Sequence, residues 1–406
     1  MWKKVFALVS VLALLLGLMP MALAEKEEVT LTLWHYFSDD SEAVLKDLVD
    51  RFNAENEQGI TVVPTFVARA DLSKQYMMGA VSGELPDIGM VDNPDHASFT
   101  TMGVFQDITD LVDAWGERDQ FFTGSLSTCM LDGRIYGLSD NSNCLAFMYN
   151  KDMFEEAGIE KVPETWDELM DTAARLTKDD VYGMVVSMPA SEEATFQFLP
   201  WLLSTGATLD TLDSPEAIKA VSFLNEMIEK GYMSRNIINW NQGESNAQFL
   251  AGKAAMQVVG PWRIKPNEES NPEMNYGVAL IPHDKYSATV LGGENFGICT
   301  GANREAAWTF LSWFMSAEIR AEYCDRAGKF PARKDSIAMR DIWTKNEVYS
   351  MYAEALSVAY ARGPHPRWPE ISSTIYTALQ ETFTGVKTPE QAMTDAAAAV
   401  REINAK

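Results

Sequence analysis

The stretch that decides the fold is residues 29–63, which read VTLTLWHYFSDDSEAVLKDLVDRFNAENEQGITVV. Apolar and polar residues alternate over 29–34, which predicts a half-buried strand. Apolar residues then recur at helical spacing over 44–52, behind the capping candidates of 39–41. A second apolar run begins at Ile60. A strand, a helix and a strand in this order form a βαβ unit, which predicts a parallel sheet in an α/β fold.

The same alternation of strand and helix signals continues along the rest of the chain. Short apolar runs predict further strands at 88–91, 133–138, 145–149, 255–259, 274–281 and 297–299. Capping residues precede apolar helical stretches at Thr165, Ser214 and Thr388, and a further helix is predicted over 306–315. The polar stretch 139–143 lies between two predicted strands, and we expect the chain to cross there from one domain to another.

The first 24 residues carry the features of a secretory signal peptide. Lys3 and Lys4 precede a nearly continuous apolar run over 5–18, and Ala22-Leu23-Ala24 forms a cleavage site. The alternative is an uncleaved membrane anchor, but the apolar run is shorter than the roughly 20 residues that span a bilayer. Cysteine is absent near residue 24, so the sequence gives no lipid-attachment signal. We expect a soluble protein, exported to the periplasm or the outer cell surface.

Composition excludes several classes of partner. The chain has 406 residues, 47% of them apolar, which is typical of a folded protein with two or three domains. Its 58 acidic and 33 basic residues give a net charge of −25. This charge disfavours nucleic acid and anionic membrane surfaces as partners.

The sequence lacks the usual signatures of metal, cofactor and catalytic sites. Neither the four cysteines nor the four histidines have metal-ligand spacing, so we predict no metal and no cofactor. Buried free thiols are expected, and Cys129–Cys144 is the best disulfide candidate. No phosphate-binding or nucleophile motif occurs. A two-carboxylate glycosidase stays open, because many acids are available and no pair is singled out.

Several aromatic residues stand beside polar residues in stretches that resemble loops. These stretches are 34–36, 239–241, 260–262 and 367–369, and each contains a tryptophan. A sugar presents apolar C–H faces and hydroxyl edges, which a flat ring and nearby carboxylate or amide groups can bind. For any single tryptophan, packing in the core is the alternative.

Five separated segments resemble the bacterial extracellular solute-binding proteins of the maltose-binding type. The opening strand and helix form the first, and GELPDI at 83–88 is the second. The third joins GRIYGL at 133–138 to YNKD at 149–152 and PETWDEL at 163–169, and the last two of these motifs are the most specific. The fourth is FLAGKAAM at 249–256 with GPW at 260–262, and the fifth is Gly292-Gly293 before a strand.

This resemblance implies a two-lobed clamp, each lobe a mostly parallel sheet flanked by helices, with hinge crossings between them. Lobe I would comprise residues 25–140 and 288–334, and lobe II residues 141–287 and 335–406. The protein would act as a monomer, bind a carbohydrate, most simply an oligosaccharide, in the cleft and deliver it to a membrane ABC permease. Two alternatives are a binding protein for a glycerol phosphodiester or other phosphorylated solute, and an exported carbohydrate-active enzyme.

The resemblance also assigns candidate ligand-binding residues. Polar candidates follow predicted strands or lie at the crossings, and aromatic candidates offer a ring for stacking. Asn143 stands where the maltose-type pattern has a carboxylate. The full set is Asp39, Asp40, Asp92, Asn93, Asn143, Phe196, Trp201, Trp240, Trp262, Glu294, Asn295, Arg367 and Trp368.

Overall fold

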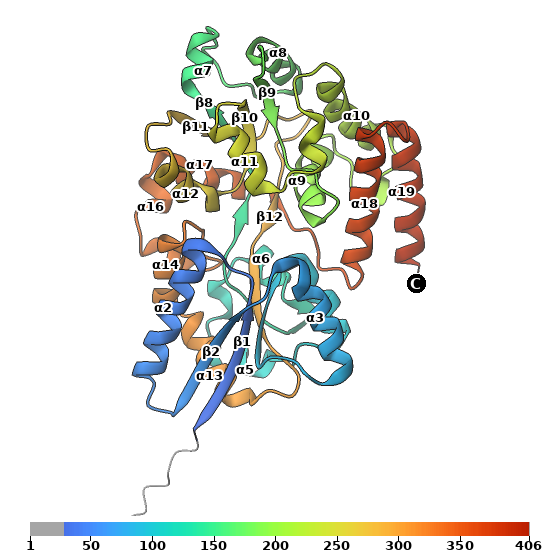
Figure 1. The fold of residues 1–406 in the computed structure, drawn as a ribbon. Coiled ribbons are helices and arrows are strands. Elements are labelled where there is room, and N and C mark those ends of the chain that lie inside the picture. Colours follow the sequence, from blue (N-terminus) through green and yellow to red (C-terminus); the bar gives the residue numbers. More distant parts are fainter. Residues whose placement is uncertain (1–27, 406) are drawn as a thin grey trace, which may run out of the picture.

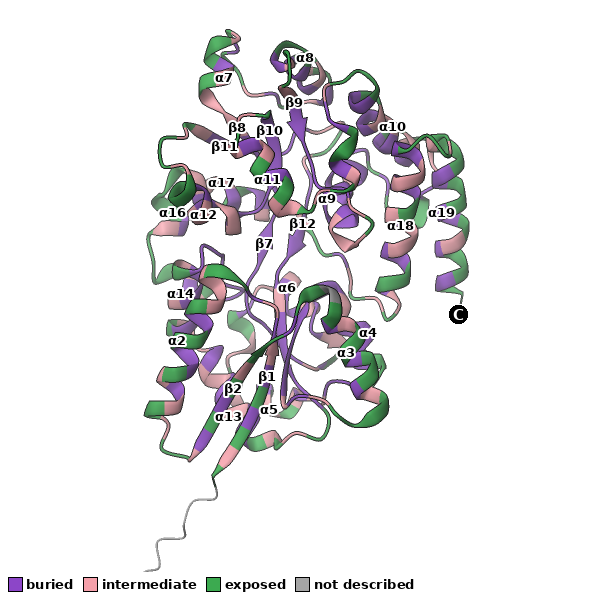
Figure 2. Cartoon of the chain, in the orientation of Figure 1, coloured by how far each residue is buried: buried purple, intermediate pink, exposed green. Residues whose placement is uncertain are grey.

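Two β-sheets, each with its own apolar core, organise the chain (Figure 1). The computed structural model describes residues 28–405, so the predicted signal peptide lies outside the described residues. Among residues 28–405, no helix has both the length and the apolar content needed to cross a bilayer. Buried residues concentrate in the strands and on the inner faces of the helices (Figure 2).

The first sheet has five strands in the order β2-β1-β3-β13-β6. β1 pairs in parallel with β2 and β3, whereas β13 pairs antiparallel with β3 and β6. The strands are β1 (Val29–His35), β2 (Ile60–Phe66), β3 (Ile88–Asp92), β6 (Leu138–Ser139) and β13 (Glu294–Ile298). The predicted βαβ unit is confirmed, because α2 (Asp39–Glu55) connects the parallel strands β1 and β2.

Helix α2 shows how the sequence produces this layer. Its buried residues, at 44, 45, 48, 49 and 52, form one apolar stripe that faces the first core. The predicted cap is wrong in its details. Ser38 occupies the N-cap position without a side-chain capping bond, and Asp39 and Asp40 lie in the first helical turn. Acidic residues are favourable there because the helix dipole is positive at that end.

The second sheet has four strands in the order β11-β8-β10-β9. β10 pairs in parallel with β9 and antiparallel with β8, and β11 is antiparallel to β8. The strands are β8 (Ala146–Asn150), β9 (Tyr182–Val185), β10 (Ala254–Val259) and β11 (Tyr276–Ala279). All six residues of β10 are buried, as expected for a central strand.

Each large sheet, together with its apolar core and covering helices, forms one of two bodies. A small third sheet, β14-β12-β7, joins these two bodies (Figure 1). It contains β7 (Asn143–Cys144), β12 (Thr289–Gly292) and β14 (Ala359–Tyr360). β7 follows β6 of the first sheet and precedes β8 of the second, and β12 leads directly into β13. The chain therefore passes between the sheets in the stretches 139–146 and 289–294.

Helices cover both sheets, and the C-terminal pair α18 and α19 packs beside α9 and α10 (Figure 1). Helices near the first sheet are α3 (Arg69–Ser82), α4 (His96–Thr101), α5 (Thr109–Trp115), α6 (Thr123–Ser127), α13 (Arg304–Phe314), α14 (Ala317–Arg326) and α15 (Lys334–Ala338). Helices near the second sheet are α7 (Lys151–Glu156), α8 (Trp166–Leu176), α9 (Glu192–Ser204), α10 (Pro215–Glu229), α11 (Gln242–Leu250), α12 (Ile264–Ser270), α16 (Ile342–Lys345), α17 (Glu347–Leu356), α18 (Trp368–Phe383) and α19 (Pro389–Asn404). Short elements complete the chain: η2 (Asn93–Asp95), η3 (Arg118–Gln120), η4 (Leu209–Thr211), η5 (Arg235–Ile238), η6 (Pro261–Arg263), β4 (Met130–Leu131) and β5 (Arg134–Ile135).

Most local predictions are confirmed. Thr165 and Thr388 each form a complete capping box, and Ser214 caps α10 through its side chain. The single strand predicted over 133–138 is wrong, since β5 ends at Ile135 and β6 begins at Leu138. All four cysteines are buried free thiols, so the Cys129–Cys144 disulfide does not form.

Candidate ligand-binding cleft

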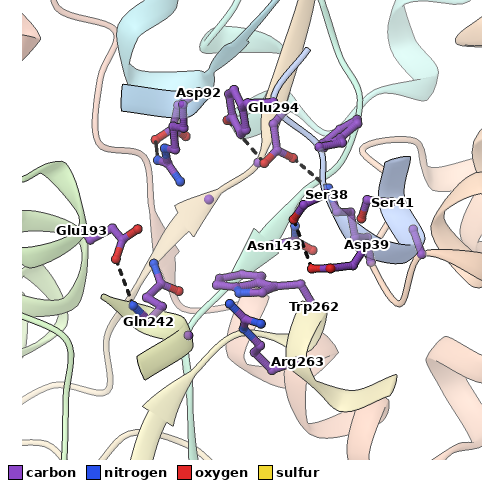
Figure 3. Close-up of a pocket in the computed structure, with 18 of the residues that line it drawn as sticks. Ser38, Asp39, Ser41, Asp92, Asn143, Glu193, Gln242, Trp262, Arg263 and Glu294 are labelled. Carbon is purple, nitrogen blue, oxygen red and sulfur yellow. Dashed lines mark hydrogen bonds and ion pairs between the residues drawn. The ribbon is translucent and has the colours of Figure 1, made fainter. Parts of the chain in front are cut away.

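A cavity of about 370 Å³ lies between the two bodies, bounded by the ends of strands from both (Figure 3). β1 and β3 of the first sheet end at it, β10 of the second sheet leads into it through Gly260, and β12 reaches it at Gly292. Ligands bind at the carboxyl ends of strands in open α/β sheets, because loops leave the sheet there. The volume lies within the range of small-molecule sites.

The start of α2 forms one wall of the cavity. Ser38, Asp39, Asp40 and Ser41 line it, and the Ser38 hydroxyl donates to an Asp39 carboxylate oxygen at 3.1 Å. Asp39 adopts a φ of +51°, in the left-handed region that few non-glycine residues occupy. This wall offers two carboxylates, which accept hydrogen bonds from hydroxyl groups.

Glu294 is held at the first residue of β13 by three donors from separate parts of the chain. The Tyr36 hydroxyl donates to it at 3.4 Å and the Lys329 ammonium at 3.2 Å, and the Asn141 amide also donates. Lys329 is only 4% exposed, and its ammonium lies 3.8 Å from the centre of the Phe37 ring. Burial lowers the pKa of Lys329, and the charge of Glu294 opposes that shift. These contacts fix the direction of the Glu294 carboxylate.

Asp92, the last residue of β3, forms a second ionic cluster. Arg69 at the start of α3 donates to it at 2.6 Å, and Arg362 donates to it at 3.1 Å. Arg362 also donates to Glu192 at 2.5 Å, and its guanidinium lies 4.4 Å from the centre of the Phe196 ring. The positive charges of both arginines are therefore balanced within the protein.

Trp262 supplies an aromatic ring to the cavity. It lies in η6, directly after Gly260-Pro261, and its ring is half-buried. The Phe196 ring lies 6.3 Å away at an interplanar angle of 28°. Gly260 allows this placement, because a Cβ atom at that position would overlap the indole. Figure 3 shows Trp262 between Asn143 and Arg263.

Two polar side-chain atoms of the cavity lining are buried without a hydrogen-bond partner in the described chain. These are Nε of Arg263, a donor, and Oε1 of Gln242, an acceptor. Burial lowers the pKa of Arg263, while the charges of Asp39 and Glu193 oppose that shift. The Gln242 backbone N–H is already used, since it donates to Glu193 at 3.0 Å. An unpaired buried polar group is costly, so both atoms favour a ligand that supplies the missing bonds.

The cavity brings together seven of the thirteen candidate residues. They come from both bodies and from the third sheet: Asp39, Asp40, Asp92, Asn143, Phe196, Trp262 and Glu294. The side chain of Asn143 donates to Asn141 at 2.6 Å and accepts from the Phe330 backbone at 3.3 Å. That these seven residues contact a ligand remains a prediction.

Three tryptophans lie elsewhere. Trp201 and Trp368 are 0% exposed and belong to the core of the second body. Trp201 packs against Trp166 and Phe223, with ring centres 6.2 and 5.8 Å away. Trp240 is half-buried against the same core and does not line the cavity. We therefore remove all three from the proposed ligand set.

Three polar candidates also point away from the cavity. Asn93, 4% exposed, accepts from Arg362 at 3.1 Å. Asn295 is fully buried, and its amide donates to Thr128 at 3.0 Å. Arg367 donates to Glu370 at 2.6 Å and to the Ile403 carbonyl at 2.9 Å. Each side chain is bonded to another part of the protein, and none of the three lines this cavity. We therefore remove Asn93, Asn295 and Arg367 from the residues proposed for the cleft.

Sequence reasoning missed many of the lining residues, including all four basic ones, Arg69, Arg263, Lys329 and Arg362, together with Glu193 and Gln242. Arg69 could have been found, because it follows a strand of the βαβ unit just as Asp39 does. Arg263 adjoins the predicted Trp262. Lys329 and Arg362 lie outside regular elements, where no local pattern marks them. In residues 28–405, no group of three or more His, Cys, Asp or Glu side chains is arranged to hold a metal ion.

A family model described as bacterial extracellular solute-binding protein matches residues 47–349. A Brucella abortus (strain 2308) protein named as a binding protein is 27% identical over 399 residues, covering 95% of this chain and 96% of that protein. The sn-glycerol-3-phosphate-binding periplasmic protein UgpB of Escherichia coli (strain UTI89) is 26% identical over 422 residues, covering 94% and 93%.

Solved structures show the same fold. An ABC transporter solute-binding protein of Thermotoga lettingae, bound with alpha-D-tagatose, superposes with a TM-score of 0.85 at 28% identity, covering 93% of this chain and 100% of that one. Maltose-bound MalE3 of T. maritima superposes with a TM-score of 0.84 at 24% identity, covering 92% and 100%. The expected fold is confirmed, and the alternative of a carbohydrate-active enzyme is wrong, because this family is not catalytic. The chain belongs to the bacterial extracellular solute-binding proteins and is the solute-binding component of an ABC transporter.

Proposed function

We propose that this protein captures a carbohydrate in the cleft, specifically an oligosaccharide, and delivers it to the membrane permease of an ABC importer. The observation that carries the proposal is the half-buried Trp262 ring on the same cavity as the Asp39, Asp40 and Glu193 carboxylates. A flat ring covers the apolar face of a sugar, and carboxylates accept hydrogen bonds from its hydroxyl groups.

The unpaired atoms of the lining support a hydroxyl-bearing ligand. A single hydroxyl group can accept a hydrogen bond from Arg263 Nε and donate one to Gln242 Oε1 or to a similar acceptor. Both atoms are buried and lack partners among the described residues. A ligand with several hydroxyl groups therefore satisfies donors and acceptors at the same time.

The charge balance of the lining supports a neutral ligand. Five acidic side chains line the cavity against four basic ones: Asp39, Asp40, Asp92, Glu193 and Glu294 against Arg69, Arg263, Lys329 and Arg362. Three of the basic side chains form salt bridges with acids, and Arg263 is the exception among the described lining residues. The cavity thus offers little positive charge to an anion. The tagatose-bound T. lettingae protein, at 28% identity, also supports a sugar.

The second candidate is a phosphorylated solute such as a glycerol phosphodiester. Arg263 favours it, because its guanidinium is not neutralised by a salt bridge and could pair with a phosphate oxygen. The 26% identity to UgpB points the same way.

We also propose the lobe boundaries 25–140 with 288–334 and 141–287 with 335–406. The pairing of β13 with β3 supports placing residues 288–334 with the first lobe. The core that residues of 145–259 share with the C-terminal helices α18 and α19 supports placing those helices with the second lobe, although Trp343, Tyr349 and Tyr352 pack in the first core. In this proposal the protein is exported after loss of residues 1–24 and acts as a monomer that closes around its ligand.

A thermal-shift screen tests the function. The panel contains mono- and oligosaccharides together with sn-glycerol-3-phosphate, and a ligand at 100 times its Kd adds about 2.7 kcal/mol to the free energy of unfolding. We expect a saccharide to stabilise the protein and to remain bound by Arg263→Gln with weakened affinity. Stabilisation by the phosphate alone, abolished in Arg263→Gln, would replace the proposal by the second candidate.

A further inference from the structure

A second and larger cavity, of about 960 Å³, adjoins the cleft on the side of α3 and α18. The two cavities share Tyr36, Arg69, Asp92 and Glu193 as lining residues, so a single wall separates them. We name this second cavity the annex and define it by its apolar lining residues, Leu72, Met77, Val91, Phe99, Met102 and Tyr376.

The annex is contributed by both bodies. α3, α4 and the end of β3 supply one side, and the first residues of α9 and α18 supply the other. α18 also contacts α4 and η2 directly. A molecule in the annex would therefore touch both bodies, as a molecule in the cleft would.

Exposed apolar surface gathers at the annex. Met77 and Met102 line it and are each 46% exposed. Methionine is flexible and polarisable, so it adapts to ligands of varied shape. Apolar surface that stays exposed in a cavity is a marker of binding.

The charged residues around the annex are largely neutralised within the protein. Arg69 pairs with Asp92, Glu192 with Arg362, and Arg367 with Glu370. Burial, together with the charges of Asp92 and Glu192, raises the pKa of Asp95 to about 8, so its carboxyl group is mostly neutral at pH 7. Glu193 is the exception, because it has no salt bridge among the described residues, but it lies at the wall shared with the cleft. The rest of the annex suits an uncharged, apolar group.

We propose that the annex binds the apolar part of the same ligand whose sugar occupies the cleft, so that the full ligand is a glycoside with an aryl or alkyl aglycone. This inference rests on the proposed function, because the sugar must sit in the cleft for its substituent to reach across the shared wall. The two cavities then form one site with two chemically different halves. Arg69 and Asp92 line both cavities, so the sugar would lie on one side of these two side chains and its substituent on the other.

Matched pairs of glycosides test the inference. The methyl and 4-nitrophenyl derivatives of α-glucose, α-mannose and α-maltose are titrated into the protein by calorimetry, with free 4-nitrophenol as a control. We expect the nitrophenyl glycoside of the accepted sugar to bind about 10-fold more tightly than the methyl glycoside, a difference of about 1.4 kcal/mol.

Variants on one helix supply the matched control. Met77→Asp places a charge in the annex and should remove the advantage of the nitrophenyl glycoside while leaving methyl glycoside binding unchanged. Met78→Asp changes the neighbouring residue, which is 62% exposed and does not line the annex, and should keep the advantage. Both sites are exposed, so both variants should fold.

The outcomes separate the two proposals. Equal binding of methyl and nitrophenyl glycosides overturns the annex and leaves the proposed function standing. Binding of free 4-nitrophenol as tightly as its glycoside overturns the idea of a single two-part ligand. If neither these glycosides nor any saccharide of the thermal-shift panel binds, the proposed function fails and the annex inference fails with it; if a saccharide of that panel binds, its own methyl and nitrophenyl glycosides decide the annex inference.

Discussion

Replacing Trp262 by alanine should weaken ligand binding much more than it weakens folding. The indole is half-buried, with Phe196 6.3 Å away and the cavity beside it. Losing the ring from a stacked sugar should cost on the order of 1–3 kcal/mol of binding, by analogy with the burial of one large apolar side chain. This corresponds to a roughly 5- to 150-fold increase in Kd, at about 1.4 kcal/mol per decade.

The expected loss of stability is smaller because of the partial burial. Removing a fully buried tryptophan costs about 3–5 kcal/mol, so a half-buried one should cost about 2 kcal/mol. Trp201 is the matched control, since it is the same residue type at 0% exposure. Trp201→Ala should show the full loss of folding stability.

The assay measures two quantities on each variant. Denaturant unfolding of the unliganded protein gives the free energy of unfolding, and titration calorimetry with the saccharide found in the thermal-shift screen gives the Kd. Wild-type affinity in Trp262→Ala would refute the stacking role. A loss of stability as large as that of Trp201→Ala would also refute it, because Trp262 would then be a core residue.

Three further predictions use other features of the structure. Gly260→Ala should raise the Kd at least about 5-fold, because the added Cβ displaces the indole of Trp262, and the melting temperature should stay nearly normal. As a control, Gly385→Ala, which does not line the cavity, should leave the Kd unchanged. Burial lowers the pKa of His96 to about 4 from about 6.5 in the unfolded chain, so the unfolded chain binds more protons and the stability falls as the pH drops through this window. The loss due to His96 should reach about 2 kcal/mol at pH 5, and urea unfolding at pH 7 and 5 should show a correspondingly smaller difference in His96→Phe. Small-angle scattering should give a smaller radius of gyration with ligand than without, because only a closed form contacts the ligand with both bodies, and an unchanged radius at saturation would contradict closure.

The fold could be predicted from the sequence because its signals are local. The alternation over 29–34, the stripe over 44–52 and the capping box at Thr165 each depend on residues close in the chain. Cleft residues at the end of a strand or shortly after it, such as Asp92 and Trp262, could be placed for the same reason. Ligand sites of open α/β sheets lie at the carboxyl ends of strands, so recognising a strand in the sequence is enough to place the residues at its end near the site.

The remaining cleft residues depend on contacts between distant parts of the chain. Arg362 meets Asp92 across 270 positions, and Lys329 meets Glu294 from an irregular segment. No spacing in the sequence encodes these pairs. The misplaced Trp368 is different, because it begins the apolar stripe of α18 with Ile371 and Ile375, and helical spacing would have assigned it to the core.

The antiparallel strand β13 has a consequence for the order of folding. β3 pairs with β1 on one side, but its other edge is covered only by β13, some 200 residues later in the chain. Until residue 298 is available, the wholly buried strand Ile88–Asp92 presents an unpaired apolar edge, which is prone to aggregation. Such long-range pairing slows folding. The late arrival of β13 therefore keeps the N-terminal sheet incomplete for as long as most of the chain is still being made, which would suit export of an unfolded chain after synthesis.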